Sequence, residues 1–156
     1  MLTSELPIDS TWIAAHIPHQ GNMCLLDHVT SWDEQTITCS AISHQQISNP
    51  LRYREQLGTA CGIEYAAQAM AVHGALLAPA DQQRPRAGFL VSIRGANIYR
   101  ARLDDLKQAL TITATIINSN DNNMLYAFTL QADSTLLLDG RAAVILNTES
   151  LLGNAT

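Results

Sequence analysis

The sequence lacks the motifs that mark several classes of cofactor site. It contains no H-E-x-x-H, no P-loop and no G-x-G-x-x-G, so we expect neither a metal nor an organic cofactor. Its three cysteines, Cys24, Cys39 and Cys61, cannot all pair within the chain, and none lies in a C-x-x-C arrangement. The sequence therefore indicates neither a disulfide framework nor a zinc site, and a reducing compartment is the expected setting.

Basic residues and long apolar runs are also scarce. Lys and Arg number 9 against 14 Asp and Glu, for a formal net charge of −5, and none of the 9 precedes Arg52. We do not expect generic binding to nucleic acid from such a chain. Met1–Ser10 offers neither the basic start nor the apolar run of a secretory leader, and no apolar stretch reaches the ~20 residues that cross a bilayer. We therefore expect a cytoplasmic protein without a membrane span.

The composition is that of one compact domain. The sequence has 156 residues, 47% of them hydrophobic and 15% charged, and it shows no internal repeat. This balance excludes intrinsic disorder, and the length suits one domain whose core needs no disulfide or metal. We expect a single domain over residues 1–156, with its core in 8–147 and short flexible termini.

The first half of the chain predicts one short helix and two strands. Asp9 or Ser10 can cap a helix that ends at the Ile17–Pro18 bond, because the residue before a proline avoids the helical region. Apolar and β-branched residues then indicate two strands between Met23 and Ser43, joined by a turn at Asp33–Glu34.

The second half predicts one long helix followed by strands. Thr59–Ala78 is dense in Ala and almost wholly apolar around its circumference, and Pro79 ends it. Three or four strands then occupy roughly 88–100, 109–118, 124–132 and 136–147, with turns at Leu103–Asp105, Asn120–Asn123 and Asp139–Gly140.

This order of elements indicates an α+β fold with an antiparallel sheet of five or six strands wrapped around the long helix. A helix that is apolar on all sides must be enclosed on all sides. One such sheet leaves part of the helix and its own edges uncovered, so we expect at least a dimer.

Glu64 is the most informative polar residue of the long helix. It lies within the apolar segment, and Gln68 stands four residues later on the same face. Burial penalises a charged carboxylate, so we expect Glu64 to hold a proton near neutral pH, and a neutral acid in an apolar slot can act as a general acid. The alternative is that Glu64 points into a subunit interface, where an arginine satisfies it.

Two further features could serve the same site. Gly58, Thr59 and Gly62 leave backbone N–H groups near the positive end of the helix, suited to polarise a carbonyl oxygen, although capping by Thr59 is a simpler explanation. His19 follows the first helix and is either catalytic or a structural hydrogen-bonding residue. The remaining histidines are expected to stay outside the site: His16, His28, His44 and His73.

Five arginines fall within a short stretch of this acidic chain: Arg84, Arg86, Arg94, Arg100 and Arg102. All stand at even positions, so those on one unbroken strand share a face, although Gly95 could interrupt the register. Such a basic stripe could dock an acidic partner or a phosphate, and a solvated strand face is the alternative.

Several of these segments together resemble the 3-hydroxyacyl-[acyl-carrier-protein] dehydratases. Ile17–His19 running into Met23–Val29 resembles their L-P-H-x-x-P-x-L-L-V-D-R-V opening, and Glu64–Ala69 is similar to their E-x-M-A-Q-A helix. Two weaker matches, to the family's F-K-R-P-V-x-P-G-D and V-D-G-K stretches, lie at 100–105 and 138–141. The chain looks like the divergent dehydratase-like branch found in bacterial aryl-polyene gene clusters.

The resemblance implies a hot-dog fold, in which an antiparallel sheet wraps a long helix and two subunits join their sheets. It also implies a substrate on the phosphopantetheine arm of acyl carrier protein, an acidic partner suited to Arg94, Arg100 and Arg102. In the family a His takes the α-proton, an acid from the other subunit protonates the leaving hydroxyl, and helix-start N–H groups polarise the thioester carbonyl. Glu64 inherits the role of the acid. The residues expected beside the substrate are Gly58, Thr59, Gly62 and Gln68.

One half of the family's acid–base pair is missing from its usual place. The family's His lies in a G-H-F-P motif ahead of the acid, where this chain has Ser48–Leu51. We therefore expect a dehydratase component with Glu64 and His19 as catalytic candidates, in a homodimer or in a heterodimer with a second hot-dog dehydratase that supplies the missing His. The alternatives are a hot-dog thioesterase that uses Glu64, and a non-catalytic acyl-binding subunit.

Overall fold

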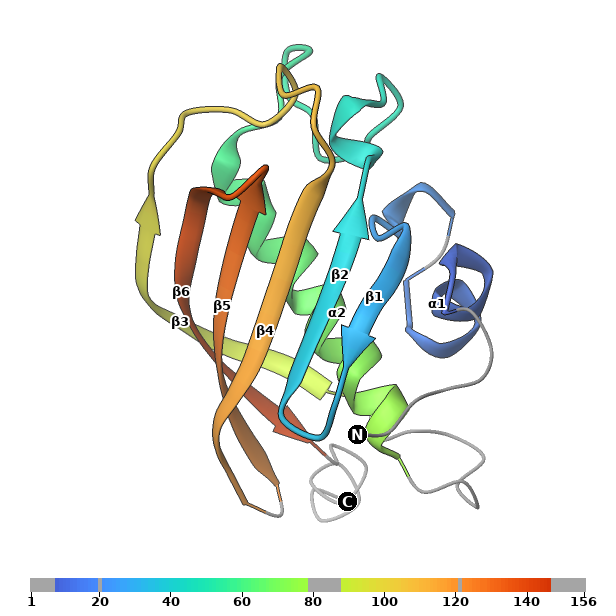
Figure 1. Ribbon diagram of the computed structural model, residues 1–156, viewed down its shortest axis with the longest axis vertical. Coiled ribbons are helices and arrows are strands. Elements are labelled where there is room, and N and C mark those ends of the chain that lie inside the picture. The colour runs from blue at the N-terminus through green and yellow to red at the C-terminus, as the bar shows by residue number, and fades with distance from the viewer. Residues whose placement is uncertain (1–7, 20, 79–87, 121, 147–156) are drawn as a thin grey trace, which may run out of the picture.

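The computed structural model describes residues 8–19, 21–78, 88–120 and 122–146. Within these residues, six strands form one antiparallel sheet that curves around a long helix (Figure 1). The expected α+β class is therefore confirmed. The termini that we expect to be flexible lie outside the described residues, as do Arg84 and Arg86 of the arginine group.

The strands follow the predicted order along the chain. Their bounds are β1 His28–Trp32, β2 Thr36–Ala41, β3 Gly88–Ile98, β4 Leu110–Ser119, β5 Asn123–Ala132 and β6 Thr135–Leu146. In the sheet they lie in the order β1-β2-β4-β5-β6-β3, so β1 and β3 are its two edges. The first strand begins at His28, later than predicted: Gly21–Met23 forms a 3-10 turn, and residues 24–27 belong to neither a helix nor a strand.

The short helix α1, Ser10–His16, begins and ends where the sequence predicts. Asp9 caps it by accepting a hydrogen bond from the Trp12 N–H at 3.0 Å. Ile17 has extended backbone, as expected of the residue before Pro18, and its N–H closes the last turn. This ending sends the chain out of the helix and into the loop that carries His19.

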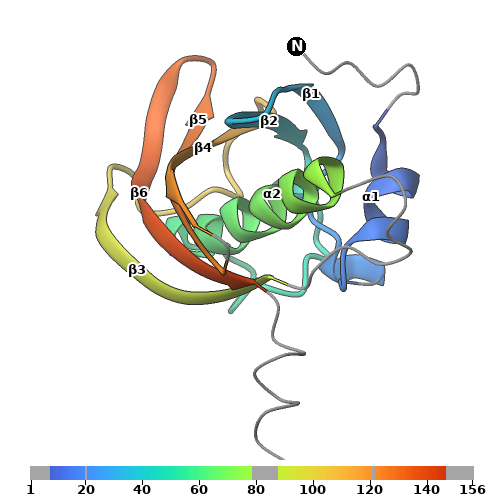
Figure 2. The same cartoon turned by 90° about the horizontal axis from the view of Figure 1, so that it is seen from below.

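The long helix α2, Gly62–Leu77, follows a 3-10 turn at Thr59–Cys61. Figure 2 shows α2 inside the curve of the sheet, with α1 on the side of α2 away from β5 and β6. A Cβ on Gly62 would lie 2.5 Å from the Leu130 Cδ2 and 2.9 Å from the Leu138 Cδ2. A larger residue here would force the Leu130 and Leu138 side chains, or the start of α2, to shift within a close-packed core.

One chain leaves a face of α2 partly open, as the sequence predicts for a single sheet. The side toward the sheet is buried and includes Tyr65, Ala66, Ala69 and Val72. Glu64, Ala67, Ala71 and Ala75 recur at helical spacing along another side and are only half-buried. Each of the described helices is too short or too polar to cross a membrane.

The β5–β6 hairpin turns at a different place from the one predicted. The turn is Asp133–Ser134, with φ of 48° and 69°, the left-handed conformation that a two-residue hairpin loop requires. Asp139–Gly140 instead lies inside β6, where Gly140 pairs with Phe128. A Cβ on Gly140 would lie 2.9 Å from the Phe128 ring, so this glycine marks a close approach and not a turn.

Candidate active site

The structure brings together the two residues that the sequence identifies as catalytic candidates. His19 lies in the loop after α1, and Glu64 lies in the first turn of α2. The His19 Nε2 is 2.9 Å from the Glu64 Oε1, and the two side chains are 25% and 33% exposed. A neutral imidazole that donates from Nε2 to the carboxylate accounts for this contact. The His19 Nδ1 is buried and has no partner among the described residues. The pair is thus an acid–base unit built within one chain.

Glu64 is not the lone buried carboxylate that the sequence predicts. Its side chain is a third exposed, because the sheet leaves this face of α2 open, and it is hydrogen-bonded to His19. The premise that burial alone keeps the carboxyl group neutral is therefore wrong for the single chain. Within the described residues, the ion-pair partner of Glu64 is His19. The alternative of an arginine at a subunit interface stays a prediction, because it concerns a second chain.

Gln68 connects α2 to the segment that follows His19. Its side chain is fully buried. Its Oε1 accepts a hydrogen bond from the Leu25 N–H at 2.9 Å, and its Nε2 donates to the Met23 carbonyl at 2.6 Å. The same Nε2 lies 3.4 Å from the Glu64 Oε1. The Gln68 amide is thus bonded within the protein, where it positions the His19 loop against Glu64. The expectation that Gln68 contacts the substrate stays a prediction.

A hydrogen-bonded chain extends this network to the position of the family's missing His. Asn49 is buried, and its Nδ2 donates to the Tyr65 hydroxyl at 3.1 Å. That hydroxyl lies 2.7 Å from the Ser43 Oγ, which donates to the Leu25 carbonyl at 2.7 Å. The Leu25 N–H in turn bonds to Gln68. Asn49 therefore serves as a structural link, with its amide held inside the protein.

Sequence reasoning missed three residues that support the site: Cys24, Ser43 and Tyr65. The Cys24 thiol donates to the His19 carbonyl at 3.1 Å, and burial raises its pKa, which favours the protonated thiol that can donate. Burial also raises the pKa of the Tyr65 hydroxyl. Their partners lie far away in the sequence or on the backbone, so no spacing rule could have found them.

The helix start offers fewer free amides than the sequence predicts. The Thr59 N–H donates to the Ala101 carbonyl at 3.2 Å, and the Gly62 N–H bonds to carbonyls of the preceding turn. Both amides are therefore bonded within the chain, and their binding of substrate stays a prediction. Side-chain capping by Thr59 is not observed either, since its Oγ1 is buried without a partner among the described residues. Gly58 is half-buried, and a hydrogen bond from its backbone to the Cys61 thiol partly offsets the rise that burial gives the pKa of that thiol.

The other histidines lie outside this pair, as predicted. His73 of α2 is buried, with its Nδ1 2.8 Å from the Tyr126 hydroxyl of β5 and its Nε2 2.8 Å from the Asp33 carbonyl in the turn between β1 and β2. His44 is also buried, and its Nε2 lies 3.2 Å from the Leu106 carbonyl. Burial lowers the pKa of both imidazoles, so both are neutral core groups.

The three described arginines of this group, Arg94, Arg100 and Arg102, do not form the basic stripe that their even spacing predicts. Gly95, with φ of 59°, interrupts the register of β3, and the strand ends at Ile98. Arg100 and Arg102 lie beyond that end, where each pairs with an acid of its own loop: Arg100 with Asp105 at 3.0 Å and Arg102 with Asp104. The guanidinium of Arg102 lowers the pKa of Asp104. Two of the three arginines expected to bind a carrier protein are therefore already paired.

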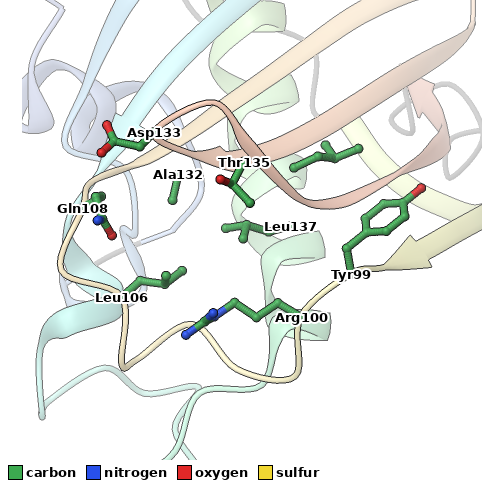
Figure 3. A pocket seen from close by; sticks show the side chains of 9 residues that line it. Tyr99, Arg100, Leu106, Gln108, Ala132, Asp133, Thr135 and Leu137 are labelled. Carbon is green, nitrogen blue, oxygen red and sulfur yellow. The ribbon is translucent and has the colours of Figure 1, made fainter.

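The pockets that we describe lie away from the His19–Glu64 pair. One, of about 250 Å³, lies between the loop after β3 and the β5–β6 hairpin, with Tyr99, Arg100 and Leu106 on one side and Asp133 and Thr135 on the other (Figure 3). A second, of about 540 Å³, lies over β3, β5 and β6. Neither is lined by His19 or Glu64, and no cluster of His, Cys, Asp and Glu in the described chain could hold a metal ion.

Comparison with solved structures supports the same architecture. The dehydratase heterocomplex ApeI:P from Xenorhabdus doucetiae contains a chain that matches with a TM-score of 0.80 and 19% identity, covering 98% of this chain and 99% of that one. A thioesterase from Haemophilus influenzae matches with a TM-score of 0.58 and 15% identity, covering 77% of each chain. A mutant thioesterase from Pseudomonas aeruginosa matches with a TM-score of 0.57 and 14% identity, over 76% of this chain and 79% of that one. The fold is the expected hot-dog fold.

At the sequence level, no curated protein matches this chain. A family model does match, and it covers residues 11–152, nearly the whole chain, including the His19 loop and all of α2. That model describes the ApeP dehydratase, in agreement with the divergent dehydratase branch that the motifs resemble. The chain belongs to the ApeP-like family of hot-dog dehydratases.

Proposed function

We propose that the chain is one subunit of a dehydratase that acts on 3-hydroxyacyl thioesters carried by acyl carrier protein. In this proposal the His19–Glu64 pair delivers a proton to the leaving hydroxyl. The observation that carries it is the 2.9 Å contact between the two side chains, in a chain that belongs to a dehydratase family. Because the pair is partly exposed, a substrate can reach the carboxyl group from outside the chain.

The reaction needs one base and one acid on the two neighbouring carbons. A base removes the proton from C2, the C2–H electrons form the C2=C3 bond, and the C3–O bond breaks as the oxygen takes a proton and leaves as water. When the pair holds one proton beyond the Nε2–H that forms this hydrogen bond, carried as a carboxylic acid on the other oxygen of Glu64, Glu64 can pass that proton to the hydroxyl oxygen while the His19 Nε2–H stays hydrogen-bonded to the carboxylate that forms. In this proposal the Gly58 N–H polarises the thioester carbonyl in place of its contact with the Cys61 thiol.

The base that removes the C2 proton comes from a second hot-dog subunit in this proposal. Asn49 lies where the family's His is expected, and its amide is held by Tyr65 and by the Ser43 carbonyl. The His19–Glu64 pair lines neither of the two pockets, and the neighbouring face of α2 is only half-buried. A second subunit over that face would both close the substrate slot and supply the imidazole. The heterocomplex that matches this fold supports such an arrangement.

The test is turnover of a 3-hydroxyacyl carrier protein by the chain alone and with a partner dehydratase, followed as the enoyl product by mass spectrometry. We expect the chain alone to be inactive and the complex to be active. Glu64→Gln should lower turnover of the complex by about 10²- to 10⁴-fold, the usual effect of losing a general acid. Glu34→Gln, at an exposed turn, is the matched control and should leave turnover unchanged.

Unchanged turnover in the Glu64→Gln complex would remove this residue from the chemistry and make the chain a non-catalytic subunit.

A second candidate function, thioester hydrolysis, is favoured by one observation: an acid–base pair in one chain needs no partner to activate a water. Release of free thiol from acyl thioesters by the chain alone, lost in Glu64→Gln, would establish hydrolysis instead of dehydration.

A further inference from the structure

A hollow of about 540 Å³ lies on the outer face of the sheet, across β5, β6 and β3. Tyr126, Phe128 and Leu130 of β5 are buried toward α2, so the alternate residues Ala127 and Thr129 face outward. These small residues, with the backbone of Gly140, make the floor. The longer side chains around it are Arg94, Asn97, Asp139 and Arg141.

Two arginines lie side by side at this hollow. Arg94 of β3 and Arg141 of β6 are direct partners in the antiparallel register, so their side chains leave the same face of the sheet side by side. Both are exposed, and neither makes an ion pair or a side-chain hydrogen bond within the described part of the chain. Like charges placed directly opposite one another destabilise a sheet. Folding alone therefore gives no reason for this arrangement.

The acid in the same hollow is already engaged. The Asp139 Oδ1 accepts a hydrogen bond from the Asn97 Nδ2 at 2.9 Å, and its Oδ2 accepts one from the Tyr99 hydroxyl at 3.1 Å. These bonds hold the carboxylate toward the β3 end of the hollow. The two guanidinium groups stay available, unlike those of Arg100 and Arg102, which pair with neighbouring acids.

We propose that the Arg94–Arg141 pair is the docking point for an acidic protein surface, that of the acyl carrier protein in the function proposed above, on which this inference rests. Guanidinium groups bind carboxylates with two parallel hydrogen bonds, and two such groups side by side suit a surface that presents neighbouring carboxylates. The hollow is broad and open, with an uncharged floor, which fits a protein surface better than a single small ion. Because the chain as a whole carries a net charge of −5, it repels an acidic partner elsewhere, and this pair directs the encounter.

The test is the affinity of holo acyl carrier protein for the full chain, measured by isothermal titration calorimetry. Charge reversal of both residues, Arg94→Glu with Arg141→Glu, should weaken binding about tenfold or more. The control double variant, Arg54→Glu with Lys107→Glu, changes the net charge by the same amount at exposed positions in two loops and should weaken binding less than about twofold. The difference between the two double variants should shrink as salt is added.

Equal losses of affinity in the two double variants would overturn the proposal, since the effect would then come from net charge alone. Unchanged affinity in the Arg94/Arg141 variant would overturn it as well. Thermal unfolding of each variant shows whether the sheet is intact, and Arg94→Gln with Arg141→Gln repeats the test without the added negative charge. Failure of the proposed function would appear separately, as a wild-type complex that binds the carrier protein but forms no enoyl product.

Discussion

Replacing Gln68 with methionine tests whether this side chain positions the catalytic pair. Methionine has nearly the same size, so packing is kept while the hydrogen bonds to the Leu25 N–H and the Met23 carbonyl are lost. Leu25 is 1% exposed, so its N–H cannot bond to water instead, and such an unsatisfied group costs about 1–3 kcal/mol. Met23 is half-buried, so the loss of the hydrogen bond to its carbonyl adds a smaller cost in stability. We expect a loss of about 2–3 kcal/mol in the free energy of unfolding. A domain whose free energy of unfolding is ~5–15 kcal/mol stays folded after such a loss.

Two measurements test the effect of Gln68→Met, one on stability and one on catalysis. Urea unfolding should show a midpoint lower by about 1 M at an unchanged slope, as expected for a loss of native stability without a change in exposed surface. In the active complex, kcat should fall by about tenfold with KM nearly unchanged, because the His19 loop is released while the substrate slot remains.

A double-mutant cycle separates positioning from a general loss of stability. In a His19→Asn background the pair is already broken, so Gln68→Met should cost the same stability but cause little further loss of kcat. Gln46→Met is the control, because Gln46 is exposed and its side chain makes no hydrogen bond among the described residues. Full additivity of the two kcat losses, or a change in unfolding free energy below about 0.5 kcal/mol, would refute the positioning role.

Two further predictions concern the core. Gly62→Ala should destabilise the chain by about 1–3 kcal/mol in urea unfolding, because its Cβ would overlap Leu130 and Leu138, whereas Gly74→Ala, where a Cβ meets nothing, should be neutral or stabilising. In the folded chain the pKa of the His73 imidazole lies below its usual 6.5, mainly because the ring is buried. The unfolded state therefore binds a proton more readily than the folded state. Its contribution to stability is complete above pH 6.5 and is lost as the pH falls toward the folded-state pKa. His73→Gln should therefore flatten the fall in stability between pH 6.5 and 5, and an unchanged slope would contradict this reasoning.

The elements of the fold could be predicted because their signals are local. The alanine-rich, almost wholly apolar run after Thr59 indicates an enclosed helix, and Asp9 and Pro18 mark the two ends of the short one. The misread hairpin shows where local signals fail. Asp139–Gly140 has the composition of a turn, but the glycine is there because Phe128 of the neighbouring strand leaves no room for a Cβ. That neighbour exists only once the strands have paired.

The sequence alone determined which chemistry was available: one acid on the long helix, an imidazole after the short helix and no histidine at the family's usual position. Only the tertiary structure decided that His19 and Glu64, 45 residues apart, form one pair, and that Arg100 and Arg102 are neutralised while Arg94 is left beside Arg141. The reason is physical. A residue type sets what a side chain can donate, accept or titrate, whereas its partner, exposure and protonation depend on groups that only the folded chain brings within 3 to 4 Å.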